Sequence, residues 1–467
     1  MLSIERTSAK ILSIGSGSMA YRPERLGYFM RAAFLTLGCK VNQYETEILS
    51  EQFASDGFEL CDPSEEADVY IVNSCTVTAG GDSKTRQLLK RCRRRNPAAV
   101  VALTGCFPQA FPDAAQRLPE ADVITGSYNR AGLLDAVKTA LATRERVIEI
   151  IPHRPNEQFE AMRAERLSGK TRAFVKIEDG CDRYCTYCII PTARGPVRSK
   201  PLDALREELV TLARNGHKEV VLVGINLPSY GRDLGLRLID AVELACGIDG
   251  IDRVRLGSLE PELLTKEDID RMAAQEKFCP QFHLSLQSGC DETLRRMHRH
   301  YTTAEYAAIV DRLRAAFPFA AITTDIMVGF PGETDEEFAE SLAFAERIGF
   351  AKAHVFAYSR RPGTKAADMS DQITKQIKES RSAKMIAATD RTRLAFMQNQ
   401  VGTIQPVLFE TAHDGYANGY TSNYTPVRVK NTDGLCGQAK YVKIIEVIDE
   451  FCHGILQQAP DDCQPSS

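Results

Sequence analysis

Three cysteines, Cys181, Cys185 and Cys188, form a Cys-x3-Cys-x2-Cys array directly after an apolar run at 174–177 that is typical of a strand. Thiolates this close together in one loop suit a soft metal centre, either zinc or an iron–sulfur cluster. A structural zinc site needs four protein ligands, and no fourth Cys or His follows nearby. An iron–sulfur cubane held by three cysteines keeps one iron open for an outside ligand. The spacing therefore favours such a cluster over a zinc knuckle or three buried thiols.

Three further cysteines, Cys39, Cys75 and Cys106, each come just after a short apolar run in the first part of the chain. The runs do not alternate with polar residues, as is typical of parallel strands covered on both faces. Because the carboxyl ends of parallel strands share one edge of a sheet, we expect the three thiols to converge. Together they predict a second cluster with one open iron, and three unrelated buried cysteines are the alternative.

The central part of the chain must position the Cys181 loop. From about 171 to 380, six predicted strands alternate with amphipathic helical patterns, which predicts a partial parallel (β/α)6 barrel with its working end at the carboxyl rim. Polar residues and glycines at that rim suit a ligand that bears a carboxylate, an amine and a ribose. The candidate contacts are Asn226, Glu260, Ser285, Gln287 and Gly329. Taken singly, each is better explained as a loop or cap residue than as a contact.

Composition and pattern divide the rest of the chain. We expect a poorly ordered extension at 1–29, a parallel-sheet α/β domain at 30–144, a polar linker at 145–170, a connecting helix at 381–400, a small antiparallel β-barrel at 401–450 and a disordered tail at 451–467. Small barrels of this kind often bind nucleic acid. Arg428 and Lys430 in the barrel, with Arg93 and Arg94 in the basic run at 90–95, are therefore candidate RNA contacts. An ordinary solvated surface is the alternative.

Bulk composition narrows the class of protein only slightly. A net charge of −4 on 467 residues means that any nucleic-acid contact must come from local basic patches. Fourteen cysteines, without a convincing secretory leader, favour metal binding in a reducing compartment over disulfides. No stretch approaches the apolar length needed to span a membrane. We therefore expect a cytoplasmic protein that does not contact a membrane.

These motifs together resemble the methylthiotransferases, a family of radical S-adenosylmethionine (SAM) enzymes. The resemblance extends from about Met30 to Val447 and includes 284–289, 325–333 and 358–364. Gly38-Cys39-Lys40-Val41-Asn42-Gln43 and Asp179-Gly180-Cys181-Asp182-Arg183-Tyr184-Cys185 look most like the branch that acts on threonylcarbamoyladenosine beside the tRNA anticodon. Sibling branches act on isopentenyladenosine in tRNA or on an aspartate of a ribosomal protein, and both stay open as alternatives.

The resemblance implies a fold, cofactors and partners. Cys181, Cys185 and Cys188 would hold a 4Fe–4S cluster that binds SAM, and Cys39, Cys75 and Cys106 an auxiliary 4Fe–4S cluster that carries the sulfur or methylthio group. One electron would cleave SAM to a 5′-deoxyadenosyl radical, which takes hydrogen from adenine C2, and a second SAM would supply the methyl group. The terminal barrel would be a TRAM domain that binds tRNA, and a flavodoxin or ferredoxin would donate the electron.

Two proteins of other kinds share some of these features. A cobalamin-dependent radical SAM methyltransferase also places an α/β domain before the barrel, but the sequence lacks the Asp-x-His-x-x-Gly signature of cobalamin binding. A zinc-containing RNA-binding protein would use the same cysteines without catalysis. Metal analysis separates the three classes.

Overall fold

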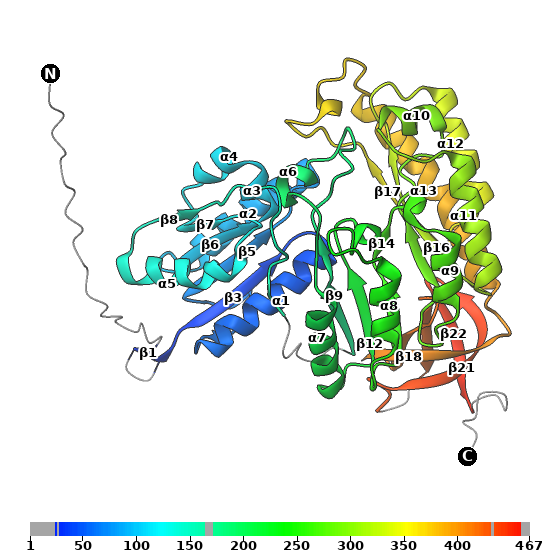
Figure 1. Cartoon of the computed structure of the whole chain (residues 1–467), viewed down its shortest axis with the longest axis horizontal. Helices are drawn as coiled ribbons and strands as arrows, with labels where there is room; N and C mark the ends of the chain where they lie inside the picture. The colour runs from blue at the N-terminus through cyan, green and yellow to red at the C-terminus, as the bar shows by residue number, and fades with distance from the viewer. Residues whose placement is uncertain (1–23, 26–27, 164–170, 431–433, 459–467) are drawn as a thin grey trace, which may run out of the picture.

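The computed structural model describes residues 24–25, 28–163, 171–430 and 434–458. The amino-terminal lobe is a six-stranded parallel sheet in the order β4-β3-β5-β6-β7-β8 (Figure 1). Its strands are β3 (Arg31–Thr36), β4 (Glu59–Leu60), β5 (Val69–Ser74), β6 (Val100–Gly105), β7 (Val123–Thr125) and β8 (Val147–Glu149), and its helices are α1 (Lys40–Ser55), α2 (Ala79–Arg95), α3 (Cys106–Ala110), α4 (Pro112–Gln116) and α5 (Leu133–Thr143).

The apolar runs of this lobe form central strands because helices cover both faces of the sheet. Along β5, Ile71 packs on the face covered by α1 and α5, whereas Tyr70 and Val72 pack on the face covered by α2. All six residues of β5 and all six of β6 are buried. Burial on both faces explains why these strands read as continuous apolar runs.

The core is an open barrel built from two parallel sheets, in the orders β13-β12-β9 and β14-β15-β16-β17. Its strands are β9 (Arg172–Lys176), β12 (Glu219–Val223), β13 (Arg253–Leu256), β14 (Ser258–Leu259), β15 (Gln281–Leu284), β16 (Ala321–Val328) and β17 (Lys352–Ala357). Two short strands, β10 (Glu178–Asp179) and β11 (Arg198–Ser199), pair beside the Cys181 loop. Because β9 and β17 are the end strands in these orders, the barrel is open between them.

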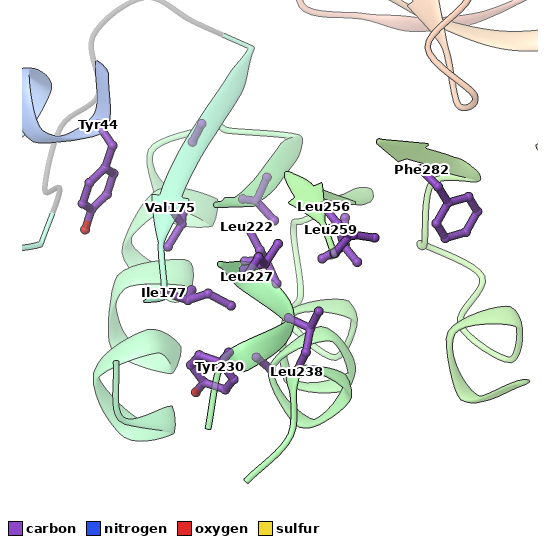
Figure 2. Close-up of a cluster of buried hydrophobic side chains, with 14 of the residues drawn as sticks. Tyr44, Val175, Ile177, Leu222, Leu227, Tyr230, Leu238, Leu256, Leu259 and Phe282 are labelled. Carbon is purple, nitrogen blue, oxygen red and sulfur yellow. The ribbon is translucent and has the colours of Figure 1, made fainter. Parts of the chain in front are cut away.

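Helices alternate with the core strands: α6 (Ile190–Arg194), α7 (Leu202–Arg214), α8 (Leu238–Cys246), α9 (Lys266–Ala273), α10 (Asp291–Arg296), α11 (Thr303–Ala316), α12 (Asp335–Ile348) and α13 (Lys375–Gln398). Thr265, Thr302 and Thr334 cap α9, α11 and α12 in reciprocal capping boxes. Side chains such as Val175, Leu222 and Leu256 gather in the apolar core (Figure 2). Tyr44 of α1 lies next to that core, so the amino-terminal lobe docks along the β9 edge.

The carboxy-terminal unit is a closed barrel in the order β18-β19-β20-β22-β21, drawn in orange and red in Figure 1. Its strands are β18 (Ile404–His413), β19 (Tyr416–Thr421), β20 (Pro426–Lys430), β21 (Ala439–Ile448) and β22 (Phe451–Gln457). The expectation of a disordered tail at 451–467 is wrong for 451–457. Cys452 is fully buried there, and β22 closes the barrel by pairing with both β20 and β21.

Other predicted boundaries also differ from the structure. Strand β8 lies inside the segment expected to be a linker at 145–170, because it adds a sixth strand beside β7. The connecting helix begins at Lys375 and not at 381, since Thr374 caps it. Residues 1–23 and 26–27 of the expected extension lie outside the described residues, whereas 24–25 pair with 28–29 as two short strands. In the described part of the chain, no helix is long and apolar enough to cross a lipid bilayer.

Candidate functional site

Cys39, Cys75 and Cys106 follow three strands that are neighbours in the first sheet. In the register of that sheet, Thr36 lies beside Asn73, and Ser74 lies beside Gly105. Cys39 is the N-cap residue of α1, Cys75 follows β5, and Cys106 begins α3. The three strands that precede the cysteines are therefore parallel neighbours, which is the arrangement on which the predicted convergence of the three thiols depends.

Glycines bring these three loops close together. Gly38 has φ +114°, and a Cβ there would lie 3.0 Å from Cβ of Cys75. Gly105 has φ +97°, and a Cβ there would lie 2.5 Å from Oδ1 of Asn73. Both positions need a residue without a side chain, because the backbone is left-handed and the neighbours are fixed. The Gly-Cys pairs of the sequence thus have a steric cause.

Arg194 links this triad to the other cysteine loop. It ends α6, which begins two residues after Cys188, and its Nε lies 3.1 Å from Sγ of Cys106. Its Nη2 donates to Oδ1 of Asn42 at 2.7 Å, and Asn42 in turn donates to the carbonyl oxygen of Ser74 at 3.0 Å. A five-residue helix therefore ties the two cysteine triads together across the boundary between the lobes.

A buried ion network surrounds Arg194. Glu45 of α1 accepts from Arg194 Nη1 at 2.6 Å and from Lys176 Nζ at 2.9 Å, and it pairs with Arg130 Nη2 at 3.0 Å. Asp179 faces the same cations, at 3.0 Å from Lys176 Nζ. Burial opposes ionisation of Glu45, but these three cations hold its pKa down to about 2. The network stabilises the docking of the two lobes beside Cys106.

The loop of Cys181, Cys185 and Cys188 follows β10 at the carboxyl end of the first core strands. Gly180 has φ +92°, and a Cβ there would lie 1.9 Å from the carbonyl oxygen of Pro196. The backbone N–H of Cys181 donates to the carbonyl oxygen of Gly195 at 3.0 Å. The loop is therefore pinned against the segment that follows α6.

Arg299 connects this loop to two of the predicted rim residues. Its Nη1 lies 3.5 Å from Sγ of Cys185 and 3.1 Å from Oε1 of Glu260, and its Nη2 donates to the carbonyl oxygen of Ser285 at 3.0 Å. The Arg299 side chain is 3% exposed. The carboxylate of Glu260 is thus already paired, and Glu260 and Ser285 act through Arg299 on the cysteine loop.

The other rim candidates differ in what their side chains offer a ligand. Asn226 donates through its backbone N–H to Glu178 at 2.7 Å, and its side-chain Oδ1 is buried without a hydrogen-bond partner among the described residues. Gln287 has φ +65°, and its side-chain Oε1 is likewise buried without a hydrogen-bond partner among the described residues. Gly329 donates through its N–H to Glu333 at 2.7 Å. Asn226 and Gln287 therefore keep acceptors that a bound ligand could use.

The thiols fit an iron–sulfur cluster better than a single ion. Within the described ranges, no three His, Cys, Asp or Glu side chains are grouped so that they could hold one metal ion. Cysteines that hold a cubane each bind a different iron, so their sulfurs spread more widely than the ligands of one ion. Burial raises the pKa of Cys106 and of Cys188 to about 12. A bound metal centre lowers the pKa of its thiol ligands, and three thiolates per site match a cluster with one open iron.

The candidate RNA contacts divide into free and occupied side chains. Arg93 pairs with Asp122 at 2.5 Å and donates to the carbonyl oxygen of Ala99 at 2.8 Å, so its guanidinium is used within the first lobe. Arg428 lies over the Phe451 ring at 3.8 Å from its centroid. Arg94 and Lys430 are exposed, and they remain available to a phosphate backbone.

Tyr420 and Tyr424 hold the terminal barrel against the core. Their rings stack at 4.5 Å, and Arg172 donates to the Tyr424 hydroxyl at 2.8 Å. Arg255 also lies over the Tyr424 ring, at 4.7 Å from its centroid. Core arginines therefore occupy faces of both tyrosine rings, which then serve the contact between the barrel and the core.

Sequence reasoning missed Arg194, Arg299 and Glu178. The side chain of each is buried and acts across long separations, such as the 88 residues between Arg194 and Cys106. The only local signal is that Arg194 and Glu178 flank the Cys181 loop. Burial raises the pKa of Glu178 well above its usual value, and its Oε2 accepts from the backbone N–H of Asn226.

Comparison with known proteins agrees with this geometry. Two family profiles match the chain, one described as "Radical SAM superfamily" over 175–345 and one as "Uncharacterized protein family UPF0004" over 31–126. The threonylcarbamoyladenosine tRNA methylthiotransferase MtaB of Bacillus subtilis is 37% identical over 439 residues, which cover 92% of this chain and 97% of that protein. The tRNA-2-methylthio-N(6)-dimethylallyladenosine synthase of Pelotomaculum thermopropionicum is 37% identical over 90% of this chain and 96% of that protein.

A solved structure shares the fold. The radical S-adenosylmethionine methyltransferase TsrM from Kitasatospora setae superposes with a TM-score of 0.54 at 16% identity, over 73% of this chain and 77% of that chain. Its similarity supports the α/β lobe followed by a radical SAM core. The identity to the methylthiotransferases extends along nearly the whole chain, and the protein therefore belongs to the radical SAM methylthiotransferases, enzymes that transfer a methylthio group and use SAM and 4Fe–4S clusters.

Proposed function

We propose that this enzyme adds a methylthio group to adenine C2 of threonylcarbamoyladenosine in tRNA, next to the anticodon. Relatives named for that reaction in Bacillus subtilis, Aquifex aeolicus and Thermotoga maritima are 37%, 38% and 38% identical to this chain. The observation that carries the proposal is the contact of Arg194 with Cys106. It brings the loop that would hold the SAM cluster to the cysteines that would hold the sulfur-carrying cluster.

We assign the two triads to two different clusters. Cys181, Cys185 and Cys188 would hold the cluster that binds SAM, and Cys39, Cys75 and Cys106 would hold the auxiliary cluster. Together these groups supply a 5′-deoxyadenosyl radical and the sulfur to be transferred, which no side-chain acid or base could provide. The contribution of the chain is to orient these groups and to keep water away from them.

Specific side chains support that contribution. Arg194 and Arg299 place N–H donors at the sulfurs of Cys106 and Cys185. Hydrogen bonds to cluster sulfurs tune the potential of an iron–sulfur centre. Oδ1 of Asn226 and Oε1 of Gln287 have no hydrogen-bond partner among the described residues, and they could accept from the amine and the ribose hydroxyls of SAM.

The partners follow from this assignment. A tRNA substrate would meet Lys430 of the terminal barrel and Arg94 of α2, which are exposed cations. The electron would come from a small redox protein such as a flavodoxin or ferredoxin. An enzyme that uses tRNA and reduced thiols would work in the cytoplasm.

The test is product analysis under anaerobic conditions. The reconstituted enzyme, with SAM, a reductant and sulfide, is incubated separately with three substrates: RNA that contains threonylcarbamoyladenosine, RNA that contains dimethylallyladenosine, and ribosomal protein. Nucleoside and peptide mass spectrometry then shows which substrate gains a methylthio group. The proposal predicts product from the threonylcarbamoyl RNA. Product from either of the other substrates alone would overturn it.

A further inference from the structure

Lys40 is an exposed lysine in an unusual place, beside the first cysteine of the auxiliary triad. It is the first residue of α1 and directly follows Cys39. Its Nζ lies 5.8 Å from the centroid of the Phe174 ring on β9 of the core. Among the residues that the structure describes, it forms no hydrogen bond or ion pair. Three N–H donors therefore remain available on its ammonium group.

The position of Lys40 places it at the open side of the core barrel. Phe174 belongs to β9, which is one end strand, and the charge of Lys40 also reaches His354 on β17, the opposite end strand. Exposed side chains of β17, including His354, border this opening. Lys40 thus lies against β9, on the amino-terminal side of the opening between the end strands.

Neighbouring cations are already neutralised. Arg172 donates to Oε1 of Glu219 at 2.6 Å, and Arg255 donates to the same oxygen at 3.0 Å. Among the described residues, the contact of the Lys40 ammonium group is with the Phe174 ring, and an aromatic ring is a weak partner for an ammonium group. Lys40 is therefore a cation on the amino-terminal side of this opening that can accept an anionic ligand, and Lys352 is a second exposed cation, on the opposite end strand.

We propose that Lys40 binds the carboxylate of the threonyl group on the substrate adenine, and thereby selects threonylcarbamoyladenosine over dimethylallyladenosine. This inference rests on the proposed function. The threonylcarbamoyl group ends in a free carboxylate, whereas the dimethylallyl group is an uncharged hydrocarbon. A carboxylate that leaves water needs a cationic partner. Lys40 directly follows Cys39 in the chain, so a substrate whose carboxylate is held by Lys40 would approach the auxiliary triad from that side.

Binding of two matched RNAs tests this role. One anticodon stem-loop carries threonylcarbamoyladenosine, and the other carries its methyl ester, which adds one methyl group and removes the charge. Fluorescence anisotropy with the reconstituted enzyme, without reductant, gives the two dissociation constants. We expect Lys40→Met to bind the acid at least about tenfold more weakly, the loss typical of a charged hydrogen bond, and to bind the ester as the wild type does. Lys40→Arg keeps the charge and most of the preference.

Controls separate this role from loss of structure. Lys266→Met removes one exposed positive charge from α9, on the outside of the core, and we expect it to leave the preference for the acid unchanged. Iron content and 5′-deoxyadenosine formation without RNA report whether the variants keep their clusters. If Lys40→Met loses iron, the same binding measurement is made with Lys40→Gln. The ratio of the dissociation constants of the acid and the ester for the wild type then gives a second, independent test.

The results distinguish a failure of the role of Lys40 from a failure of the proposed function. Equal binding of acid and ester by the wild type, or equal weakening of both by Lys40→Met, overturns the role of Lys40. If the wild type also fails to convert the threonylcarbamoyl RNA into methylthiolated product, the proposed function itself fails. Conversion by the wild type, with no effect of Lys40→Met on the acid, refutes only the role of Lys40.

Discussion

Replacement of Glu45 by Gln tests whether the buried ion network holds the two lobes together. The Glu45 side chain is 2% exposed and lies within 3.0 Å of cationic nitrogens from Arg130, Lys176 and Arg194. Glutamine has nearly the same shape but removes the negative charge. The variant therefore leaves a buried excess of positive charge between α1 and the core.

The structure sets the size of the effect. In this network four carboxylates face four cations, namely Glu45, Glu157, Glu160 and Asp179 with Arg130, Lys176, Arg194 and Arg198. Removal of one partner from a buried pair costs about 3–5 kcal/mol. Asp270→Asn is the matched control, because it removes an exposed pair with Lys266, worth less than about 1 kcal/mol.

Thermal unfolding at pH 7 measures the difference. The chain has no tryptophan, so calorimetry or far-ultraviolet circular dichroism is the suitable method. For a chain of 467 residues the shift is about 1 °C per kcal/mol, so Glu45→Gln should lower the melting temperature by about 3–5 °C, and Asp270→Asn by less than about 1 °C. A decrease no larger than that of the control would refute the structural role of the network.

The pKa of Glu45 gives the same prediction a pH dependence. Its pKa in the folded protein is about 2, below the usual 4.5, so the stabilisation from its charge is fully present above pH 4.5. That stabilisation is lost as the pH falls from 4.5 towards 2. The difference in melting temperature between the wild type and Glu45→Gln should therefore be constant from pH 8 to about pH 5 and should decrease at lower pH. A difference in melting temperature that increases as the pH falls would contradict the low pKa of Glu45.

Three further predictions concern the cluster sites and the terminal barrel. Arg194→Met should change the electron paramagnetic resonance spectrum or the potential of the auxiliary cluster and spare SAM cleavage, with partial recovery in Arg194→Lys; unchanged spectra would argue against a contact with the Cys106 sulfur. Gly180→Ala should lower iron to about four atoms per chain, because the new Cβ would meet the Pro196 carbonyl oxygen at 1.9 Å; full iron loading would contradict that steric account. Lys430→Ala should weaken tRNA binding and make it less sensitive to salt, whereas Tyr424→Phe should leave it unchanged and loosen the barrel; the reverse pattern in salt titrations would contradict these assignments.

The elements that carry cysteines could be predicted from the sequence because their signals are local. An apolar run followed by Gly-Cys, repeated at Cys39 and Cys106, indicates parallel strand ends, and the sheet order brings them together. Strand β22 was missed because its alternation is weak and only pairing with β20 and β21 makes it a strand. Arg194 and Arg299 were missed because their partners are distant in sequence, and such pairs leave no periodic pattern.

The most direct test of the account is the ratio of two products in one variant. The triple replacement Cys39→Ala, Cys75→Ala and Cys106→Ala is incubated anaerobically with SAM, reductant and threonylcarbamoyl RNA. We predict that 5′-deoxyadenosine still forms while the methylthio product disappears, and that iron falls from about eight to about four atoms per chain. Equal loss of both products, in a variant that keeps its remaining iron, would contradict two clusters with separate roles.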